Sequence, residues 1–185
     1  MHERIRTSLV AVTFLAACAL PVMAQKPASV LSDLMTDVTQ VEKKMIDLAK
    51  AIPAEKYSWR PAKGVRSIGE VLLHVSADNY LLPAMLGTPA DASTGIKGDD
   101  YKTAVAFENR KMNRDAIIVE LEKSFAHLKK SLAGTSDVKL GDKVSMFGQT
   151  FTVQQTWILT TTHAHEHLGQ MIAYARTNGV KPPWG

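Results

Sequence analysis

Cysteine is nearly absent, because the 185-residue chain has a single one, Cys18, close to its start. A lone thiol forms no intramolecular disulfide, so a disulfide-stabilised fold is excluded. Aromatic residues make up only 6% of the chain, and no run of basic residues is interleaved with them, although the formal charge is +4. We therefore expect no nucleic acid among its partners.

A long hydrophobic run is also absent, since the apolar stretch over residues 9–20 is too short for a stable transmembrane span. Arg4 and Arg6 precede this stretch, and Ala24 follows it, in the order typical of a secretory signal peptide cut before Gln25. We predict a signal peptide over residues 1–24, a mature domain over residues 25–185, and export to the periplasm or the exterior. Cleavage would also remove Cys18 and leave no thiol nucleophile.

Two alternatives remain for this N-terminal segment. Residues 15–18, Leu-Ala-Ala-Cys, resemble a lipobox, in which Cys18 would be lipidated and become the new N-terminus. The other alternative is a retained helix that anchors the chain to a membrane.

The rest of the chain has the composition of an ordinary globular domain, with 45% apolar and 22% charged residues in the whole sequence. Apolar residues that recur at steps of three and four predict helices. Ser67 with Glu70, and Thr152 with Gln155, form capping-box patterns, each of which opens a helix. The predicted helices cover about residues 30–52, 67–87, 113–132 and 152–178.

The connections between these helices complete the prediction. Residues 88–104 are rich in Gly, Asp and Thr and read as a long exposed loop, of a length that hints at function or mobility. Residues 138–151 have the glycines of a short hairpin. Because no convincing run of strands is present, the fold class we predict is all-α, a four-helix bundle.

Histidines supply the candidate chemistry. His163 and His167 are four residues apart, so they lie on one helix face, whereas His165 points to another. His74 lies between Leu73 and Val75, where an unpaired buried imidazole would be costly. We predict that His74, His163 and His167 hold one metal ion, with a coordination position open to water or substrate. The alternatives are a surface histidine pair and a core histidine satisfied by a hydrogen bond.

A competing motif overlaps this pair. Residues 163–167 read H-x-x-E-H, the inverzincin pattern of metallopeptidases. That family takes its third ligand from a glutamate far downstream, but only 18 residues follow His167 and none is acidic. We therefore set the peptidase aside.

Three segments together resemble the DinB-like (damage-inducible) superfamily: residues 57–61 (YSWRP), 67–74 (SIGEVLLH) and 163–170 (HAHEHLGQ). The resemblance implies a bundle with up-down-down-up connectivity, frequently a homodimer, and it carries the metal-ligand role onto His74, His163 and His167. Relatives include mycothiol- and bacillithiol-dependent transferases and isomerases, and proteins described as metal-dependent hydrolases. The predicted export signal departs from this largely cytoplasmic family and argues against chemistry with intracellular thiols.

Three functions follow as hypotheses: a metal-dependent hydrolase, a thiol-dependent transferase, and a non-catalytic module that binds metal or ligand. Zn²⁺ is the favoured ion, with Ni²⁺, Fe²⁺ and Mn²⁺ as alternatives that imidazole also suits. Glu166, three residues from His163, is either a base near the site or a solvated surface acid. No catalytic residue and no substrate is assigned.

Overall fold

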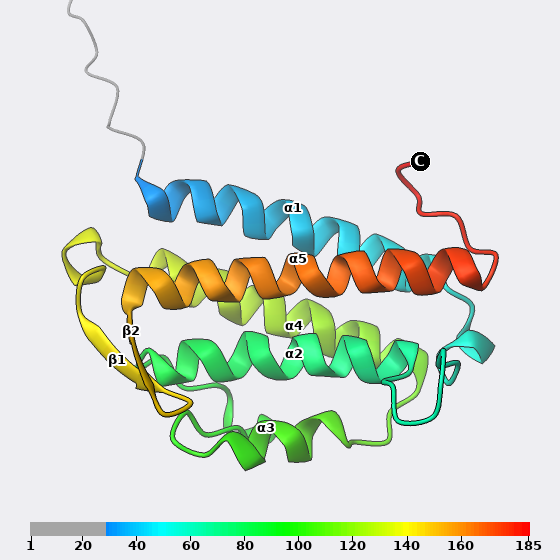
Figure 1. Cartoon of the computed structure of the whole chain (residues 1–185), viewed down its shortest axis with the longest axis horizontal. Helices are drawn as coiled ribbons and strands as arrows, with labels where there is room; N and C mark the ends of the chain where they lie inside the picture. Colours follow the sequence, from blue (N-terminus) through cyan, green and yellow to red (C-terminus); the bar gives the residue numbers. More distant parts are fainter. Residues whose placement is uncertain (1–28) are drawn as a thin grey trace, which may run out of the picture.

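The computed structural model describes residues 29–185, so the predicted signal peptide and the lipidation alternative lie outside the described residues. Four long helices form a bundle, and a short helix crosses one side of it (Figure 1). The long helices are α1 (Val30–Ala51), α2 (Ile68–Met85), α4 (Arg114–Ala133) and α5 (Val153–Thr177), and the short one is α3 (Tyr101–Glu108). No helix within this part of the chain is long and apolar enough to cross a membrane.

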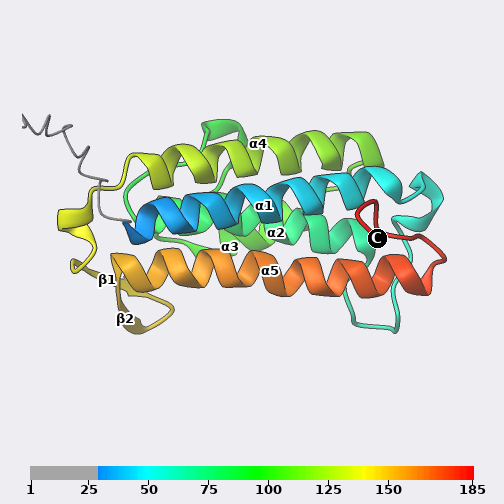
Figure 2. The same cartoon turned by 90° about the horizontal axis from the view of Figure 1, so that it is seen from above.

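Helices α1 and α5 run in one direction and α2 and α4 in the other (Figures 1 and 2). At one end of the bundle, Arg114 at the start of α4 donates to the carbonyl of Ile52, just after α1, at 3.1 Å. At the same end, Trp59 before α2 packs edge-to-face on Tyr174 near the end of α5, with ring centroids 5.3 Å apart. The long helices therefore follow the up-down-down-up order.

Local sequence determines where these helices begin. Ser67 accepts a hydrogen bond from the Glu70 amide while the Glu70 carboxylate accepts one from the Ser67 amide. Thr152 and Gln155 form the same reciprocal pair at the start of α5. Both predicted capping boxes are confirmed, and each satisfies amides that the first helical turn leaves free.

The core lies among the four long helices. Its residues include Val38, Val41, Met45 and Leu48 of α1, apolar residues of α4 that recur every three or four positions, and the buried Trp157 of α5. Helix α2 packs against α3, α4 and α5, so it is apolar on most sides. A polar side chain in the middle of α2 is consequently largely buried.

The prediction of an exposed loop over residues 88–104 is wrong from Tyr101 onward. Asp100 caps α3, which begins at Tyr101 and packs on α2, so residues 29–185 form five α-helices rather than four. The loop before α3 passes close to α2, since a Cβ atom on Gly98 would lie 2.5 Å from the Ala84 carbonyl oxygen.

The predicted hairpin is confirmed. Strands β1 (Lys143–Met146) and β2 (Gln149–Thr152) pair antiparallel, with Met146 opposite Gln149. The turn between them consists of Phe147 and Gly148, which both have positive φ, as a tight two-residue hairpin requires. The hairpin leads directly into α5.

Candidate metal centre

Three histidine side chains converge between α2 and α5. His74 comes from the middle of α2, and His163 and His167 come from successive turns of α5. Their ring centroids are 5.1, 4.7 and 4.4 Å apart, and one ring nitrogen of each lies within 4.8 Å of those of the other two. The three residues singled out from the sequence thus lie together.

Glu108, the last residue of α3, fixes the orientation of His74. Its Oε1 lies 2.7 Å from His74 Nδ1, and Arg66 holds its other carboxylate oxygen at 3.0 Å. Because an ionised carboxylate only accepts hydrogen bonds, Nδ1 of His74 carries the proton. In the neutral ring this leaves the free lone pair on Nε2, which is the tautomer of a histidine that binds metal through Nε2.

Gln170 does the same for His167. Its side-chain nitrogen donates to the Tyr174 hydroxyl at 2.9 Å, which turns its Oε1 toward His167 Nδ1 at 2.8 Å. In this orientation of the amide, His167 Nδ1 is the donor and Nε2 carries the lone pair. Tyr174 is itself held by Trp59, so the two aromatic residues support the site from the end of the bundle.

The two histidines of α5 face each other closely, with Nε2 of His163 3.0 Å from Nε2 of His167. Two lone pairs pointing at each other over this distance would repel. Without a cation, one Nε2 therefore carries a proton and donates to the other, and because His167 Nε2 has the lone pair the donor is His163.

Asp78 was not predicted and belongs to the same cluster. Its Oδ2 lies 3.3 Å from His163 Nε2 and 3.5 Å from His74 Nε2, and only 16% of its side chain is exposed. The side chains of His74 and His163 are 12% and 22% exposed, so the cluster is largely but not fully shielded from bulk solvent.

Burial determines the charge states of this cluster. It lowers the pKa of His163 to about 4, and the nearby His167 and His74 add to the effect. It also lowers the pKa of His167, against the opposing hydrogen bond to Gln170. Burial raises the pKa of Asp78 to about 6. For Glu108 burial acts upward, but the hydrogen bond with His74 and the nearby Arg66 outweigh it and lower the pKa. At neutral pH the α5 imidazoles are therefore neutral and able to bind a cation.

The other histidines of residues 29–185 lie away from this cluster. His165 contacts Asp37 of α1 at 3.0 Å, on a different face of α5. His127 of α4 packs beside the Tyr80 ring, with centroids 5.4 Å apart. Glu166 is exposed, as expected for a surface acid.

Two residues of the cluster escaped sequence reasoning. Asp78 follows His74 by four residues, the same spacing as the α5 pair, and this signal was available. Glu108 follows His74 by 34 residues on a helix that was not predicted, so no local pattern indicated it.

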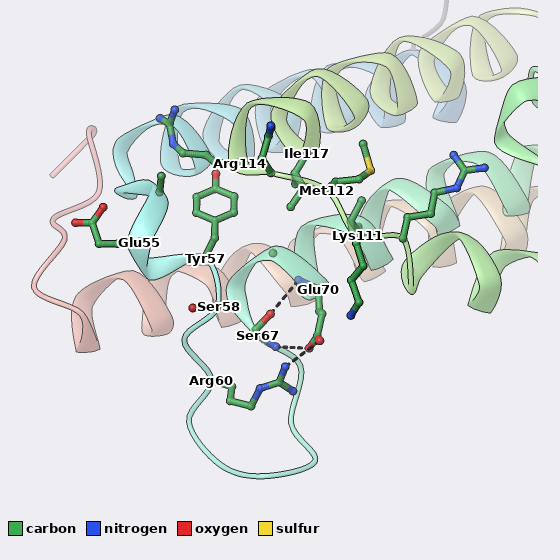
Figure 3. A pocket seen from close by; sticks show the side chains of 15 residues that line it. Glu55, Tyr57, Ser58, Arg60, Ser67, Glu70, Lys111, Met112, Arg114 and Ile117 are labelled. Atoms are coloured by element: carbon green, nitrogen blue, oxygen red, sulfur yellow. Dashed lines mark hydrogen bonds and ion pairs between the residues drawn. The ribbon is translucent and has the colours of Figure 1, made fainter.

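A separate groove of about 700 Å³ lies between the α1–α2 connection and the starts of α2 and α4 (Figure 3). None of the three histidines lines it. Its arginines are largely committed, since Arg114 donates to the Lys50 and Ile52 carbonyls and Arg60 pairs with Glu70. This groove is not the histidine site.

Comparison with known proteins agrees with the fold. The family model of the DinB superfamily matches residues 37–171. A DinB-like protein from Bacillus cereus has a TM-score of 0.66 and 17% identity, over 81% of this chain and 93% of that one. A conserved protein from Enterococcus faecalis has a TM-score of 0.67 and 14% identity, over 80% of this chain and 96% of that one.

A mycothiol-dependent maleylpyruvate isomerase shares the fold as well, with a TM-score of 0.61 and 15% identity. The match covers 76% of this chain but 60% of the isomerase. No curated protein matches the sequence. At these identities the solved structures show a common fold and nothing finer.

Proposed function

From the premise that this chain belongs to the DinB superfamily, we propose that it binds one divalent metal ion on His74, His163 and His167 and acts as a metal-dependent hydrolase. The observation that carries the proposal is the orientation of the imidazoles. Glu108 and Gln170 each accept a hydrogen bond from the Nδ1–H of one histidine, which leaves the Nε2 lone pairs of the neutral His74 and His167 rings directed at one common region.

The donor set fits a divalent ion. Neutral imidazole binds Zn²⁺, Ni²⁺ and Fe²⁺. The usual support for such a ligand is a carboxylate that accepts a hydrogen bond from the other ring N–H. The lowered pKa values of His163 and His167 keep these rings unprotonated at neutral pH, so a cation need not displace a proton from an imidazolium. Zn²⁺ is our first choice.

The ion would serve as a Lewis acid toward water or a substrate oxygen. The chain's own contribution is to hold the three nitrogens, to keep bulk water away from them, and to place the Asp78 carboxylate beside them. A carboxylate beside the ion could accept a proton from a bound water, and this feature favours a hydrolase over a metal-storage module.

A thiol-dependent transferase is the second candidate. It is favoured by the shared fold of the mycothiol-dependent isomerase. Our proposal that residues 1–24 are a cleaved signal peptide argues against it, because low-molecular-weight thiols of this kind act inside the cell. N-terminal sequencing of exported protein tests the signal peptide: a start at Gln25 supports it, and a lipidated Cys18 or a retained Met1 contradicts it.

The functional test begins with metal analysis of protein purified without added metal. The purified protein is then screened against esters, amides and thiol-transfer substrates, each with and without added thiol. Hydrolysis that is lost on chelation and independent of thiol supports the proposal, whereas turnover only with thiol supports the transferase. Bound metal without any turnover would favour the binding module. Light scattering tests the homodimer, which we retain as a proposal from the family.

A further inference from the structure

We infer that Asp78 is a fourth protein ligand of the ion, so that the site has three imidazoles and one carboxylate. This inference rests on the proposed function, since it concerns the same ion. It goes beyond the three-histidine site that the sequence predicts and changes what the site can do.

The site is built from two facing helices, α2 and α5. Asp78 follows His74 by four residues on α2, and His167 follows His163 by four residues on α5. Residues at this spacing lie one turn apart on the same helix face. Each helix therefore presents two potential ligands, and Asp78 lies against His74 and His163 where the helices face each other.

The separations between the candidate ligand atoms match those expected around one ion. Two ligand atoms that each lie about 2.0–2.2 Å from one ion, at angles between roughly 90° and 110°, are separated by about 2.8–3.6 Å. Oδ2 of Asp78 is 3.3 Å from His163 Nε2 and 3.5 Å from His74 Nε2. His163 and His167 are 3.0 Å apart at Nε2. These separations suit neighbouring ligands of one ion.

The negative charge of the Asp78 carboxylate also favours a cation at this position. Within residues 29–185 the Asp78 carboxylate makes only these two long contacts to imidazole nitrogens, without a hydrogen bond. In the neutral form of His74 with its proton on Nδ1, Nε2 directs a lone pair rather than a proton toward it. The nearby Arg66 is paired with Glu108. A carboxylate with only 16% of its side chain exposed is costly to keep charged unless it is paired or coordinates a metal, and a divalent ion at this point would supply positive charge.

A fourth ligand has a chemical consequence. A tetrahedral zinc ion would be saturated by four protein ligands, which is the arrangement of structural sites, so the hydrolysis proposed above would require zinc to accept a fifth ligand. An ion that accepts five or six ligands, such as Fe²⁺, Mn²⁺ or Ni²⁺, would keep positions for water or substrate. The oxygen donor also makes the site more favourable for Mn²⁺ and Fe²⁺ than three imidazoles alone.

The direct test is a crystal structure of the full mature protein loaded with Zn²⁺ or Co²⁺, with the ion located by anomalous scattering. We expect an Asp78 oxygen at about 2.0–2.2 Å from the ion. In solution, Zn²⁺ affinity is measured by competition with a chromophoric chelator for Asp78→Asn. The matched control is Asp47→Asn, which removes a carboxylate paired with Lys43 on the surface of α1.

Loss of a supporting residue outside the ligand set typically costs 10–100-fold in affinity, so loss of a ligand should cost roughly 100-fold or more. The Asp47→Asn protein should keep the wild-type affinity. An ion on the three histidines with Asp78 more than about 3 Å away, or equal affinities for the two variants, would overturn the inference and leave the proposed function standing. Absence of any ion from the three histidines of the wild-type protein would overturn both.

Discussion

Glu108 and His74 are 34 residues apart in the sequence, yet the Glu108 carboxylate lies 2.7 Å from His74 Nδ1. The contact joins α3 to α2 and fixes which nitrogen of His74 faces the other histidines. It makes the short helix part of the proposed metal site rather than a mere connection.

Replacing Glu108 by Ala should therefore weaken metal binding without removing a ligand. We expect a loss of roughly 10–100-fold in Zn²⁺ affinity, because His74 would no longer be held in the correct tautomer and orientation. The Glu108→Gln variant should lose less Zn²⁺ affinity, since its amide oxygen can still accept a hydrogen bond from Nδ1–H. Chelator competition measures both, and an Ala variant with wild-type affinity would show that this contact has no role in binding.

We expect the ionised Asp78 carboxylate to destabilise the metal-free protein. Its pKa is raised from 3.8 to about 6 in the fold, so the folded protein binds more protons than the unfolded chain between these values. As far as Asp78 is concerned, the free energy of unfolding is highest below about pH 3.8 and falls as pH rises to about 6. At 1.36 kcal/mol per pKa unit, the loss is on the order of 3 kcal/mol.

Asp78→Asn removes this ionisation. In chelator, the variant should be more stable than the wild type at pH 7–8, and the difference should shrink toward pH 4. Chemical denaturation at several pH values measures the free energy of unfolding of both proteins. A difference that does not change with pH would show that Asp78 ionises as easily in the fold as in the unfolded chain.

Gly98 should be required for the position of α3. A Cβ atom there would lie 2.5 Å from the carbonyl oxygen of Ala84 in α2, so backbone must move. We expect Gly98→Ala to cost roughly 1–3 kcal/mol in unfolding free energy and to weaken metal binding through Glu108.

Gly141→Ala is the control, because a Cβ at Gly141 meets nothing within 4 Å. It should change stability by no more than about 0.5 kcal/mol. Equal thermal stability of the two variants would mean that the loop before α3 adapts without cost.

The long helices were predictable because α1 and α4 have a sustained apolar period, whereas α2 and α5 begin at recognisable capping boxes. Helix α3 was not, because eight residues are too few to establish a period and the preceding segment has the composition of a loop. The hairpin was suggested by its glycines.

At the site, spacing alone paired His163 with His167, and burial in an apolar stretch drew attention to His74. The same spacing rule applied to His74 and Asp78 would have found the carboxylate. Glu108 depends on how α3 packs, and the tautomers depend on Glu108 and Gln170. Such tertiary contacts leave no local pattern in the sequence.

The most direct test of the central claim is a Zn²⁺ titration, by calorimetry, of the wild-type protein and of the His163→Ala and His165→Ala variants. These two histidines lie on the same helix, but His163 faces His74 and His167 whereas His165 pairs with Asp37. We predict one ion per wild-type chain, the same binding for His165→Ala, and loss of tight binding for His163→Ala. Unchanged binding by His163→Ala, or loss of binding by His165→Ala alone, would contradict the three-histidine site.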